Sequence, residues 1–136
     1  AVLRLSEQGL LSLSDPAHVH VDPALARLNS SSMLSLFGPS ALNVTVYHLL
    51  AMQSGIYDFD DDTTRAYCNS HPDRDVSPFD DLAFASVRGE KLPTFPAGTK
   101  VDYSSTNFEL LGLVLVHHLH AAGWDSPGLQ RDAVCA

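Results

Sequence analysis

Apolar residues recur at helical spacing in one long stretch toward the end of the chain. Three or four positions separate successive members, which places them on one face of an α-helix. They are Leu110, Leu111, Val114, Leu115 and Leu119. We expect this helix to span residues 105–122, because Gly123 follows and glycine commonly closes a helix. The pattern alone predicts a core helix.

The rest of the pattern predicts shorter helices joined by polar connections. One helix should end near Gly9, and another should begin at Thr45, whose hydroxyl can accept a free amide hydrogen, and end at Ser54 and Gly55. A further short helix is expected over residues 80–87. Residues 15–23 predict an extended connection, and residues 29–40 and 58–78 predict loops, because Pro, Ser, Gly and Asp interrupt any periodicity there.

Composition and charge limit the classes of function. The chain has 136 residues, 45% hydrophobic and 18% charged, which is typical of a single globular domain. The formal charge of −8 disfavours binding to nucleic acid or to an anionic membrane surface. No apolar run approaches the roughly 20 residues that span a bilayer. We therefore expect no nucleic acid and no membrane span.

Two cysteines, Cys68 and Cys135, have no spacing typical of a metal or redox motif. A disulfide between them stays open, and two reduced thiols are the favoured interpretation. The tripeptides Asn29-Ser-Ser and Asn43-Val-Thr fit the glycosylation pattern and favour secretion weakly. The sequence does not otherwise indicate a compartment.

Histidine and aspartate side chains are candidate metal ligands in two parts of the sequence. His117 and His120 can share a helix face, but no carboxylate or cysteine stands at ligand spacing, and histidines near a helix end also complement its dipole. The acidic run 58–62 lacks the Gly and Glu of a calcium loop, since Thr63 and Asn69 stand there. We expect no metal and no cofactor.

Three blocks of the sequence carry a resemblance. Residues 95–115 include Pro-Ala-Gly-Thr-Lys-Val-Asp-Tyr-Ser-Ser-Thr-Asn-Phe-Glu-Leu-Leu-Gly, residues 44–56 read Val-Thr-Val-Tyr-His-Leu-Leu-Ala-Met-Gln-Ser-Gly-Ile, and residues 3–16 include Gly-Leu-Leu-Ser-Leu-Ser-Asp-Pro. These blocks resemble segments of the serine β-lactamase and penicillin-binding-protein family, which follow one another along the family's sequence in the same order as here. Residues 95–115 resemble its tyrosine motif, Tyr-Ser-Asn-Thr-Asn-Phe-x-Leu-Leu-Gly. The resemblance covers about residues 2–123.

The resemblance implies an α-rich α+β fold, the helical subdomain of a β-lactamase/transpeptidase-like domain with most of the sheet missing. No Ser-x-x-Lys nucleophile motif occurs in the chain, and the family's Lys/His-Thr/Ser-Gly strand is also missing. We therefore expect residues 1–136 to be an internal fragment, a partial β-lactamase-related domain with one catalytic wall of three. Such a fragment should be inactive alone and should self-associate, because its long helix is apolar over more than one face.

Two residues are the candidate catalytic positions. The resemblance implies that Tyr103 transfers a proton during attack by a serine, and that Ser105 stands where the family has an Asn that contacts substrate. A Ser hydroxyl is shorter than a carboxamide and offers one group instead of two. This favours hydrolysis of an ester or amide in a small-molecule or peptide-like substrate, through an acyl-serine, over strong β-lactamase activity. The alternative is a non-catalytic scaffold or interaction module.

Overall fold

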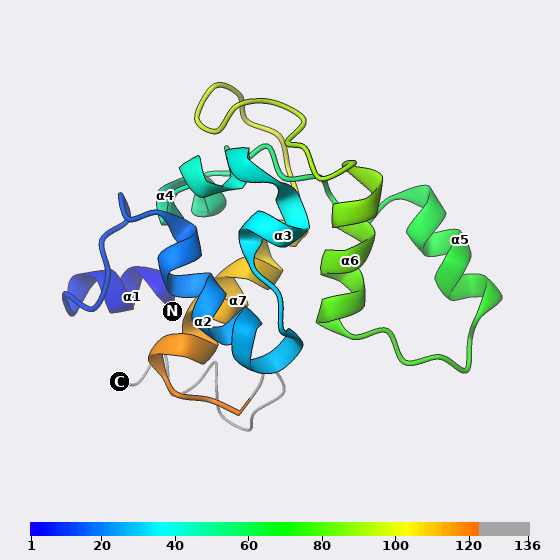
Figure 1. The fold of residues 1–136 in the computed structure, drawn as a ribbon, viewed down its shortest axis with the longest axis horizontal. Coiled ribbons are helices and arrows are strands. Elements are labelled where there is room, and N and C mark those ends of the chain that lie inside the picture. Colours follow the sequence, from blue (N-terminus) through cyan, green and yellow to red (C-terminus); the bar gives the residue numbers. More distant parts are fainter. Residues whose placement is uncertain (123–136) are drawn as a thin grey trace.

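Helix α7 (Thr106–His118) is the helix on which four others pack (Figure 1). The structure, a computed structural model, describes residues 1–122. Helix α2 (Ala17–Asn29) makes the most extensive contact with α7. Further contacts come from α1 (Val2–Glu7), α4 (Val46–Leu50) and α6 (Pro78–Arg88). Residues 1–122 contain no strand, so the predicted helix-rich fold without its sheet is confirmed.

The apolar faces of α7 are covered within the chain itself. Leu110, Leu113 and Val114 are fully buried, and they pack in one core with residues of α2, α4 and α6 such as Leu25 and Leu82. The expectation that α7 leaves a broad apolar surface uncovered is therefore wrong for the body of this helix. No helix within residues 1–122 is both long and apolar enough to cross a membrane.

The segment expected to be an extended connection is helix α2. Pro23 lies inside it and removes one backbone donor. The helix persists because one face, including Val21, Ala24 and Leu25, is buried against the core. Burial of a face therefore outweighs the loss of one hydrogen bond. The helical spacing of these buried positions is not obvious in the sequence, because polar residues and Pro23 lie between them.

Two expected loops also contain helices. Within 29–40 lies α3 (Met33–Phe37), and a 3₁₀ helix, η1 (Pro39–Asn43), begins there as well. Ser32 starts α3 by accepting the Ser35 amide hydrogen, while the Ser35 hydroxyl accepts the Ser32 amide hydrogen. Within 58–78 lies α5 (Asp62–Ser70), at the outer edge of the molecule beyond α6 (Figure 1).

The structure confirms the predicted start of α4 but places the ends of α4 and α7 earlier than expected. Thr45 caps α4 as expected, because its hydroxyl accepts the His48 amide hydrogen while His48 Nδ1 accepts the Thr45 amide hydrogen. Helix α4 ends at Leu50, earlier than Ser54. Helix α6 contains the predicted span 80–87. Helix α1 ends two residues before Gly9, which has a left-handed φ of 73°, and α7 ends at His118 rather than near residue 122.

One of the two cysteines can be placed. Cys68 is half-buried on α5. Cys135 lies outside the described residues, so a pairing between the two stays untested.

Candidate functional site

The connection that carries Tyr103 is held against the turn after α4. Its backbone amides at Thr94, Gly98 and Asp102 donate to the carbonyl oxygens of residues 55, 53 and 52 at 2.7, 2.9 and 2.9 Å. The approach is so close that a Cβ on Gly55 would lie 2.1 Å from the Phe95 carbonyl oxygen. Glycine is therefore required at position 55, where φ is also left-handed at 73°.

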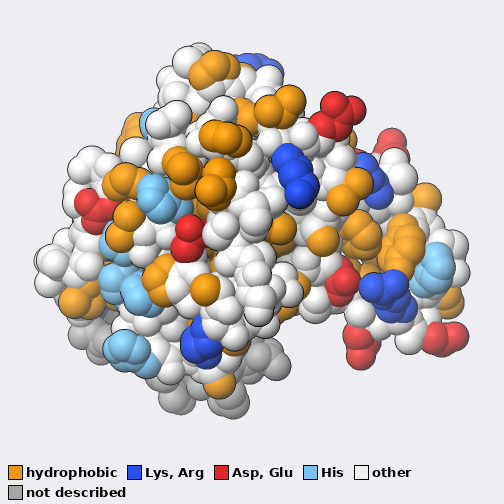
Figure 2. All heavy atoms as spheres, viewed as in Figure 1, with side chains coloured by type: hydrophobic (Ala, Val, Ile, Leu, Met, Phe, Trp, Pro, Cys, Tyr) orange, Lys and Arg blue, Asp and Glu red, His pale blue; other side chains and the backbone are white. Residues whose placement is uncertain are grey.

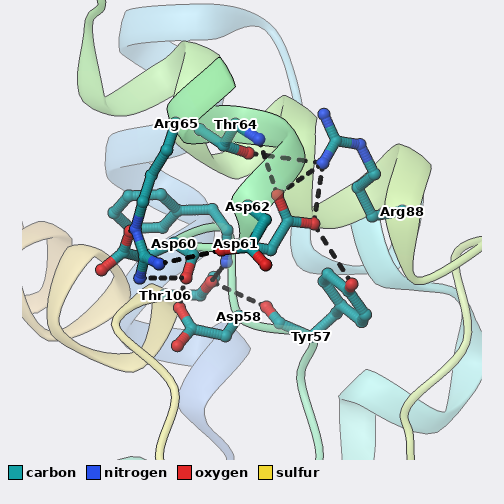
Figure 3. A network of polar contacts seen from close by, with 10 residues as sticks. Tyr57, Asp58, Asp60, Asp61, Asp62, Thr64, Arg65, Arg88 and Thr106 are labelled. Carbon is teal, nitrogen blue, oxygen red and sulfur yellow. Dashed lines mark hydrogen bonds and ion pairs between the residues drawn. The ribbon is translucent and has the colours of Figure 1, made fainter. Parts of the chain in front are cut away.

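The first turn of α7 is joined to the chain segment that follows this turn. The Thr106 hydroxyl donates to the Tyr57 carbonyl oxygen at 2.7 Å and accepts the Phe59 amide hydrogen at 3.1 Å. The Ser105 amide donates to the Asp58 carboxylate at 3.0 Å. Figure 3 shows Thr106 beside Tyr57 and Asp58. These bonds join positions 47 to 49 residues apart and fix where α7 begins.

Asn107 makes a second connection deeper in the core. Its carboxamide oxygen accepts a hydrogen bond from Ser54 Oγ at 2.7 Å, and Ser54 Oγ also accepts the Ile56 amide hydrogen at 3.1 Å. The Asn107 amide group donates to Met52 Sδ. Asn107 and Ser54 are both buried, so each polar group depends on the other for its partner. The Ser-Gly block and the tyrosine motif are thereby one structural unit.

Tyr103 stands on this fixed base with its side chain 62% exposed. It borders a hollow of about 260 Å³ whose other lining residues come from segments 56–61 and 94–102. Its ring lies 6.2 Å from that of Phe108, and the two rings are tilted. The structure thus places Tyr103 at the end of the connection and beside a concave surface, next to the turn after α4.

Ser105, the second candidate position, differs from Tyr103 in its surroundings. It is half-buried and does not belong to the lining of the hollow, although its partner Asp58 does. It occupies the position before α7, but its side chain forms no capping hydrogen bond. The Ser105 backbone is helical, with φ −60° and ψ −28°, rather than extended as at a capping residue, and its own amide donates to the Asp58 carboxylate.

Asp61, which lines the hollow, is held in an ion pair with Arg88 of α6. Arg88 Nη1 lies 2.7 Å from both carboxylate oxygens of Asp61, which also accepts the Thr64 amide hydrogen at 2.7 Å and the Tyr57 hydroxyl at 3.2 Å (Figure 3). Burial acts to raise the pKa of Asp61, but the bonds from Arg88 and Thr64 outweigh it and lower the pKa to about 2. The same carboxylate caps α5.

Sequence reasoning missed this network. The spacing of Asp61 and Thr64 is that of a helix cap, a signal that was available in the acidic run. Arg65 holds the neighbouring carboxylates of Asp60 and Asp62 at 2.9 and 3.2 Å. Within residues 1–122 no group of three His, Cys, Asp or Glu side chains could hold a metal ion.

The histidines separate into two arrangements at the other end of α7. His118 Nε2 lies 3.0 Å from His20 Nδ1, and His20 Nε2 lies 3.0 Å from the Asp15 carboxylate. Burial, followed by the charges of His117, His20 and His120, lowers the pKa of His118 to about 4. His117 and His120 face a separate groove with Arg27. His48 serves the cap of α4, a structural role.

Comparison with known proteins agrees with the fold. The family model described as Beta-lactamase matches residues 1–124, so the chain belongs to the beta-lactamase family. Its helices correspond to a helical portion of this serine-hydrolase-like fold. A comparison with curated proteins gave no match.

A solved structure extends the comparison. The crystal structure of a D-stereospecific amidohydrolase from Streptomyces sp. is similar, with a TM-score of 0.64 and 29% sequence identity. The match covers 85% of this chain and 32% of that one. The chain thus spans about a third of the length of this relative.

Proposed function

We propose that residues 1–136 are a partial β-lactamase-related domain, one active-site wall of a serine hydrolase that cleaves an ester or amide through an acyl-serine. The nucleophile and its lysine would come from a Ser-x-x-Lys motif elsewhere in a longer polypeptide. Tyr103 would transfer the proton. The substrate would be a small molecule or peptide-like compound, and no cofactor takes part.

The observation that supports this most strongly is the contrast between Tyr103 and its neighbours. Ser104, Thr106 and Asn107 are at least 97% buried, whereas the Tyr103 ring is 62% exposed at the hollow. An aromatic ring gains stability by burial, so an exposed one on a rigid base contributes little to folding. Such a placement suits a group that must meet a substrate in a fixed position.

The reaction requires two proton transfers. As the serine oxygen forms its bond to the carbonyl carbon, its proton must leave, and the departing oxygen or nitrogen must then receive a proton. A phenol hydroxyl next to a lysine ammonium can do both, since the ammonium favours the phenolate. Tyr103 supplies this group in the proposal.

The choice of substrate follows from Ser105 and from the relative. Ser105 offers no carboxamide to a substrate amide and does not line the hollow, so strong binding of a β-lactam is not expected. Amides and esters of D-configured residues are the first compounds to test, because the similar structure is a D-stereospecific amidohydrolase. The two glycosylation tripeptides are consistent with a secreted protein.

Covalent labelling tests the proposal. A fluorophosphonate probe should label one serine in the longer polypeptide and none in residues 1–136, which should also fail to hydrolyse a chromogenic β-lactam or an activated ester. Turnover by residues 1–136 above that of a Tyr103→Phe control would contradict the proposed fragment. Absence of labelling in the longer polypeptide would contradict the acyl-serine.

The second candidate is a non-catalytic scaffold of the same fold. The observation that favours it is Ser105, which replaces a substrate-binding Asn and lies outside the hollow. This candidate predicts a folded longer polypeptide that takes no probe and turns over no ester. The labelling experiment therefore separates the two.

A further inference from the structure

A second concave site lies at the end of α7 that is remote from Tyr103. It is a groove of about 280 Å³ between α2 and α7, lined by Pro23, Ala24, Arg27, Val116, His117 and His120. Figure 2 shows histidine side chains gathered over this part of the molecule. The 13 residues of α7 separate the groove from the tyrosine wall by roughly 20 Å. The groove therefore belongs to a different site.

The floor of the groove is apolar, and its walls carry nitrogen donors. Ala24 and Val116 are buried, whereas Arg27 and His120 are exposed and His117 is half-buried. Arginine is a permanent cation, and each imidazole offers at least one N–H. This sets the groove apart in a chain whose formal charge is −8.

Arg27 is held in place from across the groove. Its two terminal nitrogens donate to the carbonyl oxygens of Ala121 and Ala122 at 2.8 and 3.3 Å. A guanidinium carries more N–H groups than these two bonds use. The head group is thereby positioned at the end of α7 while retaining donors for a ligand. A fixed guanidinium recognises planar or tetrahedral oxyanions better than a free one.

His120 is held by an unusual backbone conformation. Its φ is 52°, in the left-handed region that favours glycine, and the amides of His120 and Ala121 donate to the carbonyl oxygens of His117 and Val116. A side chain at this position costs backbone strain that glycine would avoid. The imidazole is nevertheless placed beside His117 and opposite Arg27.

The charges around His117 are all positive or neutral nitrogen groups. Burial lowers the pKa of His117, and His20, His120 and Arg27 lower it further. His118, which precedes the turn, is bonded to His20, and Asp15 faces His20 rather than the groove. Complementing the helix dipole accounts for histidines on α7 but not for an arginine from α2 that converges on them.

We propose that this groove binds a small, doubly charged oxyanion of the phosphate type, held between Arg27 and the imidazoles of His117 and His120. The ligand joins α2 to the end of α7. A divalent metal fits less well, because the residues from 1 to 122 offer no third ligand and the guanidinium would repel it.

The test follows the imidazole carbon-bound protons of the whole chain by NMR during titration with sodium phosphate, with sodium chloride at equal ionic strength as reference. His117 and His120 should show saturating shifts, and His71, an exposed histidine on the turn after α5, should not. With sulfate as the ligand, binding should be tighter at about pH 6 than at about pH 8, because protonated imidazole favours the anion. Linear shifts without saturation, or equal shifts at His71, would overturn the proposal.

Two variants assign the binding to the groove. Arg27→Gln should weaken phosphate binding by about tenfold or more, whereas Arg65→Gln, a matched exposed arginine on α5, should not. His120→Gly removes an imidazole while suiting the left-handed backbone, so it should lose affinity without losing stability. Unchanged affinity in either groove variant would contradict the site, even if the hydrolase proposal held.

Discussion

Ser54 Oγ donates a 2.7 Å hydrogen bond to the carboxamide oxygen of Asn107 across 53 residues of sequence. This bond joins the turn after α4 to the first turn of α7, and Tyr103 lies three residues before α7 begins at Thr106. The position of the candidate catalytic group therefore depends on a buried polar contact as well as on apolar packing.

Two buried serines provide a matched test of this contact. Ser54 and Ser104 are 1% and 3% exposed, but the Ser104 hydroxyl has no hydrogen-bond partner among residues 1–122. Ser54→Ala should lower the free energy of unfolding by about 1–3 kcal/mol, because it leaves the Asn107 oxygen unpaired. Ser104→Ala should be neutral or stabilising. Urea denaturation of both variants measures this, and equal losses would show that the Ser54 bond has no special weight.

Asp81 predicts that stability increases as the solution becomes moderately acidic. Burial, followed by the charges of Asp80 and Asp60, raises the pKa of Asp81 to about 6, and burial and Asp81 raise the pKa of Glu109 on α7. The folded state therefore favours the protonated carboxyl. The contribution of the protonated Asp81 carboxyl to stability is present below about pH 4 and is lost as pH rises through about 6.

The variant Asp81→Asn should raise the melting temperature by a few degrees at neutral pH and by less in acid. Asp73→Asn, at an exposed position, is the control. Thermal melts across this pH range decide the point. An Asp81→Asn gain that does not change with pH would mean that ionisation of Asp81 is not its cause.

His118 predicts that stability decreases as the solution becomes acidic, the opposite of the effect of Asp81. Its pKa is about 4 in the folded chain against an ordinary 6.5, so the unfolded chain binds the proton more readily in between. The stability contribution of the neutral imidazole is complete above 6.5 and declines as pH falls toward about 4. His118→Gln, compared with His71→Gln, should flatten this part of the stability profile. An unchanged profile would mean that ionisation of His118 does not cause this dependence.

Self-association remains a prediction, and it now rests on a few exposed apolar side chains near the start of α7. Helix α7 is covered by its neighbours, but Val101, Tyr103 and Phe108 are exposed by more than half near its start. Phe108→Ser should reduce binding of a hydrophobic dye and any dimer seen by sedimentation, whereas Val87→Ser on α6 should change neither. A monomeric, dye-silent chain with a cooperative melt would contradict the prediction.

The helices with strong local signals could be predicted from the sequence. Helix α7 has an uninterrupted apolar period, and the reciprocal cap at Thr45 follows from two residues three positions apart. Helix α5 could not be predicted by periodicity, because Thr64 is its only residue that is buried. It depends on Asp61, which caps it and pairs with Arg88 from another helix. An ion pair between residues distant in sequence produces no periodic pattern of hydrophobic positions.

The candidate site was predicted in part. The tyrosine motif located Tyr103 at the entrance of α7, but the far wall of its hollow comes from residues 56–61. Those residues meet the motif only through tertiary hydrogen bonds, such as the one from the Ser105 amide to Asp58. Ser105, which stands at the sequence position of the family's Asn, does not itself line the hollow.

Substitution at Ser105 tests this difference. In the longer polypeptide, Ser105→Asn restores a carboxamide and should raise kcat/KM for a β-lactam by about fivefold to tenfold, the value of one hydrogen bond. Ser105→Ala should have little effect on ester hydrolysis. A large loss of ester hydrolysis in Ser105→Ala would instead assign the hydroxyl a direct role.

Steady-state kinetics of Tyr103→Phe in the longer polypeptide test the central claim most directly, with Tyr47→Phe, an exposed tyrosine outside the hollow, as the matched control. The substrate is an activated ester or amide of a D-configured residue. We predict that Tyr103→Phe lowers kcat by about 10²–10⁴-fold with an unchanged melting temperature, as loss of a proton-transfer group should. Tyr47→Phe should keep full activity. A Tyr103→Phe variant that retains the parent kcat would contradict the account.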